Sequence, residues 1–452
     1  MIHPIQIFFL FLVLSKSLLS VPKLESELKY LFLFIGDGMG NSQLHLSRFA
    51  YPENEIVFLQ FPVIAMVSTE STTVITDSAA AATSIATGEK TYNGSICISA
   101  DKKRKLVPIS KILAKKGYRI GIVSSVSLDH ATPAVFYANA YSRNQYKQIG
   151  EALFSSDFHF FGGGGLKKFG PKEMKKSLLK NNFFVSHDPN EIGSLDLDKK
   201  VYLTPREYSS GSSLSSEINR ATDQLSLAKV VGAAIDHLSK RESPFFLMAE
   251  SGKIDWGGHS NDAAMVASEI QAFNHAISEA MDFYNRHPNE TLILVTADHA
   301  TGGLGLGNDR LKKASHYELL KNQKIGEWEF DLKMQIWWKE KRSFTSLLEE
   351  IERFFGLSPK ASELPLILSE KDLQDLEKAY QESFLSEDGK YKKFLSNKVT
   401  ELMSEKTGVG WTTTDHTAEP VNLFALGKGS QNFQGFYSSN EIFFKILELI
   451  EP

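Results

Sequence analysis

The sequence predicts an α/β fold in which a mostly parallel central sheet is covered by helices on both faces. Three observations support this prediction. Short apolar runs alternate with amphipathic stretches along most of the 452 residues, polar motifs follow the ends of these runs, and 42% hydrophobic side chains suffice for a large buried core. Strands buried on both faces of a parallel sheet appear as continuous apolar runs, as these do.

The individual elements follow from periodicity. The expected strands are residues 30–35, 63–68, 119–124, 158–161, 245–249, 292–296 and 421–426. The expected helices are residues 78–87, 108–116, 222–239, 262–285 and 441–450. The polar motifs fall mainly just after the carboxyl ends of the expected strands, which is the edge of an open α/β sheet where ligands bind.

Residues 305–410 differ from the rest, and we expect a helical insertion there. Apolar spacing predicts a helix at residues 344–355. Ser369 and Asp372 resemble a capping box that begins a second helix, and a third is expected at residues 391–406. The insertion could serve as a cap, a crown or an oligomer contact.

The N-terminus carries an apolar run, residues 5–14, of the length found in secretory signal peptides. It predicts a signal peptide over residues 1–20, with cleavage near Ser20, leaving a catalytic domain at residues 21–452. A buried first strand is the alternative, since no Lys or Arg precedes the run. We therefore expect an exported protein, periplasmic or secreted, without a stable membrane span after signal removal.

Composition narrows the classes of partner. The formal net charge of −4 gives no basic footprint for nucleic acid, so small molecules are the expected partners. The single cysteine, Cys97, excludes an intrachain disulfide. In an exported protein, stability must then come from the core and from bound metals.

Carboxylates and imidazoles follow three of the expected strands. Asp37 lies in a Gly-Asp-Gly-Met-Gly segment after the first strand, and Asp298 and His299 follow another strand. Each could instead be a turn or capping residue. Glu250, Asp255 and His259 follow a third strand, and their glycine-rich surroundings argue against an ordinary helix face. Together these residues predict oxygen- and nitrogen-rich metal pockets.

Ser78 is the candidate nucleophile. It opens an alanine-rich helix, and backbone N–H groups at a helix N-terminus favour an anion such as a phosphate or an alkoxide. A simple helix cap is the alternative. Because no G-x-S-x-G elbow surrounds Ser78, a metal is the better candidate for its activation than a general-base histidine.

Six stretches, in this order, resemble the alkaline phosphatase family. They are residues 34–40, 76–83, 129–133, 250–259, 296–301 and 413–417. The resemblance covers roughly residues 31–304 and 411–427 and does not extend to the insertion. It implies a parallel-sheet α/β core that holds two Zn²⁺ ions and usually one Mg²⁺ ion, and it makes a homodimer possible.

The resemblance also implies roles for individual residues. It gives the first zinc the ligands Asp255, His259 and His416, and the second zinc the ligands Asp37, Asp298 and His299. It gives magnesium the ligands Asp37, Thr132 and Glu250. It makes Ser78 the nucleophile and Arg143, oriented by Asp77, the clamp on the phosphoryl oxygens.

The chain departs from the family pattern at two positions. His130 stands where some members carry an aspartate near the third metal, and Trp256 where some carry a lysine or histidine near the phosphate. An imidazole favours a softer ion than all-oxygen ligation does, so His130 makes magnesium the less certain metal. Arg143 raises a further difficulty, because a straight helix from residue 133 would place it about 16 Å from Thr132. That helix must end early, bend or run past the site.

The expected reaction is hydrolysis of phosphate monoesters through a phosphoserine on Ser78. Enzymes accelerate such reactions by factors on the order of 10²¹, which a lone serine cannot supply. Two metals roughly 4 Å apart stabilise both the entering and the leaving oxygen. Two alternatives remain open: a phosphodiesterase of the same superfamily, and a zinc-dependent phosphate-binding protein without turnover.

Overall fold

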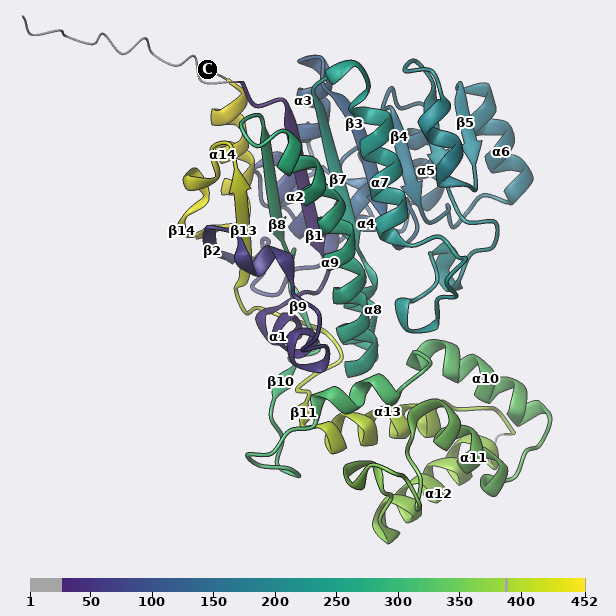
Figure 1. Cartoon of the computed structure of the whole chain (residues 1–452). Helices are drawn as coiled ribbons and strands as arrows, with labels where there is room; N and C mark the ends of the chain where they lie inside the picture. Colours follow the sequence, from purple (N-terminus) through teal and green to yellow (C-terminus); the bar gives the residue numbers. More distant parts are fainter. Residues whose placement is uncertain (1–26, 387–388, 452) are drawn as a thin grey trace, which may run out of the picture.

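The computed structural model describes residues 27–386 and 389–451 (Figure 1). The predicted signal peptide, residues 1–20, lies outside the described residues. Within the described part of the chain, no helix is both long and apolar enough to cross a membrane.

A ten-stranded sheet forms the centre of the molecule, in the order β14-β2-β13-β8-β1-β7-β3-β4-β6-β5. Its strands are β1 (Tyr30–Gly36), β2 (Val63–Ser68), β3 (Arg119–Ser124), β4 (Phe160–Gly163), β5 (Phe183–Ser186), β6 (Lys200–Leu203), β7 (Phe245–Ser251), β8 (Thr291–Thr296), β13 (Val421–Gly427) and β14 (Gly435–Ser438). Neighbouring strands are parallel, except that β13 runs antiparallel to β8 and β2. The predicted mostly parallel sheet is confirmed.

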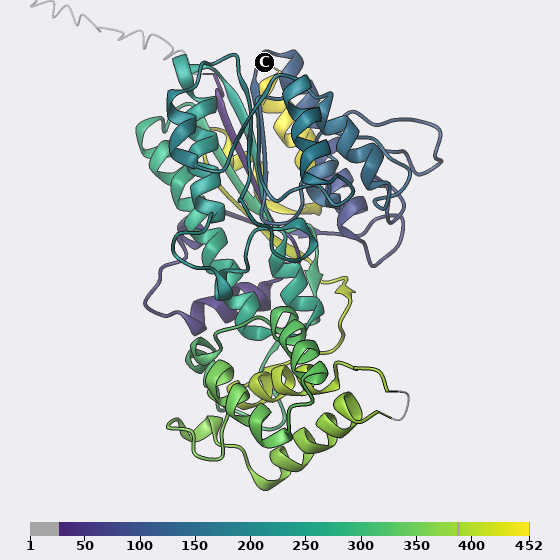
Figure 2. The ribbon, with the colours of Figure 1, turned by 90° about the vertical axis from the view of Figure 1, so that its right-hand side faces the viewer.

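Helices cover both faces of the sheet, as predicted. Figure 2 shows α7 and α9 on one face and α2 and α14 on the other. The helices of this part are α1 (Asn41–Ala50), α2 (Ser78–Thr87), α3 (Ile109–Lys115), α4 (Ala131–Ala134), α5 (Tyr146–Phe154), α6 (Pro171–Lys180), α7 (Leu227–Leu238), α8 (Lys253–His259), α9 (Ala263–Arg286) and α14 (Glu441–Ile450). The central strands β1, β3, β7 and β8 are buried along their whole length, which explains their continuous apolar sequences.

Four more helices gather beside one end of the sheet (Figure 1). They are α10 (Glu327–Lys339), α11 (Phe344–Phe355), α12 (Glu370–Phe384) and α13 (Phe394–Thr407). Ser369 and Asp372 form the predicted capping box at the start of α12. The chain enters and leaves this region through β10 (Gly305–Leu306) and β11 (Val409–Gly410), which pair antiparallel.

These four helices share a hydrophobic cluster that is separate from the core around the sheet. Its centre includes Phe330, Leu347 and Leu402 from the helices themselves. Leu46 of α1 and Ala267 of α9 belong to the same cluster, so the helices pack against the sheet-bearing part of the chain through apolar contacts. The burial of this shared surface fixes where α10 and α13 lie relative to the ends of the strands.

Candidate metal centre and nucleophile

The candidate site lies at the carboxyl ends of three adjacent parallel strands. Asp37 follows β1, Glu250 is near the end of β7, and Asp298 and His299 follow β8. The register pairs Ile35 with Glu250, so the polar side chains emerge at the same level of the sheet. All four polar side chains are buried. Strand order and register therefore assemble residues that are far apart in the sequence.

Asp37, Asp298 and His299 form one group whose ligand atoms could hold a metal ion. Nε2 of His299 lies 3.3 Å from Oδ1 of Asp37 and 3.6 Å from Oδ2 of Asp298. The backbone between β1 and α1 must pass close to this group. Gly38 has a φ of +76°, and a Cβ there would lie 2.7 Å from Cα of Asp255, so only glycine suits the position.

Asp255 and His259 lie on α8, which corrects the expectation that their glycine-rich segment would not be an ordinary helix. The i,i+4 spacing brings Nε2 of His259 to 3.4 Å from Oδ2 of Asp255. The glycines between them serve packing instead: a Cβ on Gly258 would lie 2.9 Å from Cβ of Thr301. Close approach of α8 to the strand after Asp298 therefore explains the glycines without breaking the helix.

His416 reaches the site through a two-residue ladder. β12 (His416–Thr417) pairs antiparallel with β9 (Ala300–Thr301), the segment that follows His299. Nε2 of His416 lies 3.2 Å from Nε2 of His259 and 3.6 Å from Oδ1 of Asp255. Asp255, His299 and His416 form a group whose ligand atoms could hold one metal ion. His259 is not a member of that group but contacts it through His416 and Asp255.

His259 and His416 are both oriented by backbone carbonyl groups. Nδ1 of His416 lies 2.8 Å from the carbonyl oxygen of Thr76, and Nδ1 of His259 lies 2.5 Å from that of Thr414. A histidine that donates one ring N–H to a carbonyl presents its other nitrogen to a metal in a fixed direction. In both residues the nitrogen left facing Asp255 is Nε2.

The third group consists of Asp37, His130 and Glu250. Nδ1 of His130 lies 3.7 Å from Oε1 of Glu250. Oγ1 of Thr132 lies 3.5 Å from Oδ2 of Asp37 and from Oδ2 of Asp298, so this hydroxyl joins the same region.

Ser78 is the first residue of α2 and is buried. Its Oγ lies 3.2 Å from Nε2 of His299, beside the group formed with Asp37 and Asp298. The preceding residue, Asp77, is the N-cap of α2 and accepts a hydrogen bond from the backbone N–H of Ala80. The hydroxyl therefore lies between a helix N-terminus and a cluster of metal-ligating atoms.

Arg143 reaches the same point, because α4 ends at Ala134 and the chain folds back. The backbone N–H of Arg143 donates to the carbonyl oxygen of Gly94, and Nη1 donates to Oδ2 of Asp77 at 3.0 Å. Nη2 lies 3.2 Å from Nε2 of His130. The early end of the helix resolves the distance problem that a straight helix would create.

The electrostatics of the site favour binding of cations. Burial, together with the charges of neighbouring carboxylates, raises the pKa values of Asp37 and Asp298 well above the usual range. Burial opposes ionisation of Asp255 too, but its hydrogen bond to His259 and the nearby imidazoles lower its pKa overall. In turn Asp255 raises the pKa of His259 to about 9 against the effect of burial.

Buried polar atoms without hydrogen-bond partners also favour bound cations. Oδ1 of Asp37, Oε1 of Glu250 and Nδ1 of His130 are all buried, and none has such a partner in the structure. Atoms of this kind are costly to bury unless a ligand satisfies them. Carboxylate oxygens and imidazole nitrogens at these separations fit metal ions well.

Comparison with known proteins shows which family has this fold and this sequence pattern. The family model for alkaline phosphatase matches residues 28–178 and 209–451. The chain belongs to the alkaline phosphatase family. As a member of this family the protein is a phosphatase, and the resemblance found in the sequence is confirmed.

Individual family members show how far the likeness extends. Alkaline phosphatase 3 of Bacillus subtilis is 27% identical over 442 residues, which cover 92% of this chain and 88% of the relative. The cold-active alkaline phosphatase of Shewanella sp. superposes with a TM-score of 0.79 at 28% identity, covering 93% of this chain and 100% of that structure. A histidine-to-aspartate variant of the alkaline phosphatase from the Antarctic bacterium TAB5, with magnesium in its M3 site, has a TM-score of 0.66 at 29% identity, covering 94% of this chain and 98% of that one.

Two residues near the site of this family member were missed by sequence analysis. Lys167 and Trp328 line a cavity of about 360 Å³ together with His130, Trp256 and His259. Lys167 follows a run of four glycines that gave no sign of a site. Trp328 lies on α10, in the region that carried no family signature. Contacts between α10 and the start of α9 bring it near the site: Phe330 shares a hydrophobic cluster with Ala263, and the backbone N–H of Glu327 donates to Asp262.

Proposed function

We propose that this phosphatase hydrolyses phosphate monoesters through a phosphoserine formed on Ser78. The observation that carries the proposal is the position of Ser78 Oγ, 3.2 Å from Nε2 of His299. It lies at the start of α2, one residue from the Asp77 carboxylate that pairs with Arg143. A nucleophile beside a guanidinium and metal-ligating groups suits phosphoryl transfer better than binding alone.

We further propose that the metals are two zinc ions and a third ion. Asp255, His259 and His416 would hold one zinc, and Asp37, Asp298 and His299 the other. Asp37, Thr132 and Glu250, with His130 alongside, would hold the third ion, for which magnesium is the expected metal. When bound, such ions lower the pKa of a coordinated hydroxyl or water and neutralise charge on phosphoryl and leaving oxygens.

The protein's own residues then act in two displacements. In the first, Ser78 Oγ loses its proton and bonds to phosphorus, while the bond from phosphorus to the ester oxygen breaks. The ester oxygen takes up one proton, which balances the one lost by Ser78, and leaves as the alcohol. In the second, the oxygen of a water molecule bonds to phosphorus and the bond from phosphorus to Ser78 Oγ breaks. One proton of that water passes to Oγ, and inorganic phosphate leaves. Arg143, held by Asp77, offers a planar pair of N–H groups to two phosphoryl oxygens in both steps.

The test compares wild type with a Ser78→Ala variant on p-nitrophenyl phosphate. We expect a loss of at least about 10³-fold in kcat for the variant, since removing a nucleophile has effects of this order. A brief acid quench of wild type during turnover should reveal phosphate on the peptide that contains Ser78. Equal hydrolysis by both proteins would overturn the proposal, and faster cleavage of bis-p-nitrophenyl phosphate would identify a phosphodiesterase.

A further inference from the structure

We propose that the cavity between Trp256 and Trp328 receives the alcohol portion of the substrate and selects monoesters of aromatic alcohols. This inference rests on the proposed function, because it names the class of leaving group for the same reaction. The cavity is about 360 Å³, within the usual range for small-molecule sites. The sheet-bearing part of the chain contributes one indole and α10 contributes the other.

The cavity borders two residues that contact the proposed site. His130 lines it on one side, and Nε2 of that residue lies 3.2 Å from Nη2 of Arg143. His259 lines it on another side, and Nε2 of that residue lies 3.4 Å from Oδ2 of Asp255. A phosphoryl group held by Arg143 would therefore direct its organic substituent past His259 into this cavity.

Trp256 is a fixed wall. It lies on α8 directly after Asp255, so the helix that presents the carboxylate also sets the indole. Its ring meets the ring of His130 edge to face, at 6.4 Å between centroids and an interplanar angle of 75°. A Cβ on Gly211 would lie 2.9 Å from Cη2 of the indole, so the opposing loop leaves no room for a side chain at this position.

Trp328 supplies an apolar surface that substrate could cover. Its side chain is 51% exposed although it lines the cavity. An aromatic leaving group that stacks against an indole buries surface on both partners and gains from the ring contact itself. A small polar alcohol such as glycerol gains neither, so the cavity favours aryl over alkyl esters.

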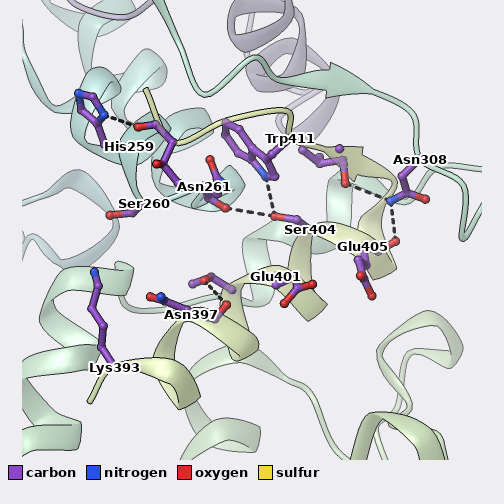
Figure 3. A pocket seen from close by; sticks show the side chains of 14 residues that line it. His259, Ser260, Asn261, Asn308, Lys393, Asn397, Glu401, Ser404, Glu405 and Trp411 are labelled. Carbon is purple, nitrogen blue, oxygen red and sulfur yellow. Dashed lines mark hydrogen bonds between the residues drawn. The ribbon is translucent and has the colours of Figure 1, made fainter. Parts of the chain in front are cut away.

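The larger neighbouring cavity is a weaker candidate for the same role. It measures about 600 Å³ and also borders His259, but it lies against α13 (Figure 3). Several of its polar groups bond to one another: Ser404 accepts from Nε1 of Trp411, and Nδ2 of Asn308 donates to the carbonyl oxygen of Glu405. The polar groups of this wall therefore already have hydrogen-bond partners within the protein. Neither His130 nor Trp256 lines this cavity.

The experiment measures kcat/KM for 1-naphthyl phosphate and for glycerol 2-phosphate in wild type, Trp328→Ala and Trp328→Phe. We expect the naphthyl-to-glycerol ratio to fall about tenfold in Trp328→Ala, the effect of losing one aromatic contact, and to remain near the wild-type value in Trp328→Phe. Leu332→Ala is the matched control, because Leu332 is 45% exposed one turn further along α10 and does not line the cavity. It should leave the ratio unchanged.

A binding measurement separates substrate contact from other effects. Titrating 1-naphthyl phosphate into Ser78→Ala should quench tryptophan fluorescence, with weaker binding after the additional Trp328→Ala change. An unchanged ratio in Trp328→Ala, including an equal loss of kcat/KM for both substrates, would overturn the inference. If wild type hydrolyses neither ester, the proposed function itself fails, which is a distinct result.

Discussion

Oδ2 of Asp77 lies 3.0 Å from Nη1 of Arg143, while Oδ1 of the same carboxylate accepts hydrogen bonds from the backbone N–H groups of Ala80 and Gly94. One side chain therefore caps the helix that begins with Ser78 and also orients the guanidinium. The proposed nucleophile and the proposed phosphate clamp depend on a single carboxylate.

Two substitutions of Asp77 should separate these roles. Asp77→Asn keeps an acceptor for Ala80 and loses the charge that holds Arg143, so we expect about a tenfold fall in kcat/KM with little change in Tm. Asp77→Ala should lose activity and also about 1 kcal/mol of stability. Steady-state kinetics and thermal unfolding check both. As a control, Asp188→Ala removes a cap that is bonded to Asn190 and does not contact the site. It should affect stability alone, and full activity in Asp77→Asn would contradict the expected role.

Chelation of the metals should remove activity and lower Tm together. Asp37, Asp298, Asp255 and Glu250 are buried within one small region, and without cations their mutual repulsion opposes the folded state. After dialysis against a chelator, we expect zinc to restore Tm and most of the activity, and magnesium alone to restore little. The measurements are calorimetry and p-nitrophenyl phosphate hydrolysis on the same samples. An unchanged Tm in metal-free protein would argue against buried cation sites.

Replacing His130 by aspartate should strengthen magnesium binding at the third group. The change leaves only oxygen ligands around Asp37 and Glu250, which is the environment that magnesium prefers. It also puts a carboxylate beside Nη2 of Arg143. We expect activation at lower Mg²⁺ concentrations, measured by titrating the metal into zinc-loaded protein. His275→Asp, on an exposed part of α9, serves as the control and should not shift the titration. Identical curves for wild type and His130→Asp would exclude His130 from the third site.

Asp262 should make stability depend on pH at the junction with α10. It caps α9, and it accepts hydrogen bonds from Gln323 and from the backbone N–H of Glu327. Burial is the main reason that its pKa rises from 3.8 to about 6. The folded protein binds this proton more tightly than the unfolded chain does. The protonated Asp262 therefore contributes to the free energy of unfolding fully below pH 3.8, and this contribution is lost as pH rises through about 6.

The comparison is urea unfolding of wild type and Asp262→Asn at pH 5 and pH 7.5. Other titrating groups are common to both proteins, so they largely cancel in the difference. We expect the stability of wild type relative to the variant to be greater at the lower pH. The same difference in free energy of unfolding between the two proteins at both pH values would show that Asp262 has an ordinary pKa.

Much of the fold could be predicted because burial on both faces makes strands conspicuous. The fully buried β1, β3, β7 and β8 appear directly as apolar runs, and their carboxyl ends located the polar residues. The strands β5, β6 and β14 were not predicted, since they are short and lie toward the edges of the sheet. Each of them has only four residues, so its apolar run is too short to stand out from the surrounding sequence.

Some relationships within the site depended on tertiary contacts that no local pattern encodes. The proximity of His416 to Asp255 follows from pairing between β9 and β12, and that of Arg143 to Asp77 from the early end of α4. The glycines of α8 were taken to argue against an ordinary helix face, although close packing of Gly258 against Thr301 explains them within a helix. Trp328 reaches the cavity only through the docking of α10.

The antiparallel pair β10–β11 returns the chain to the place from which it departed, with Gly305 opposite Gly410. The length and sequence of the segment between those two positions can therefore vary without changing the order of the strands in the ten-stranded sheet. Such variation can alter α10, which carries the Trp328 wall of the proposed alcohol site, while the proposed phosphate-binding groups stay fixed. Within such a scaffold, substrate range and chemical step can diverge independently.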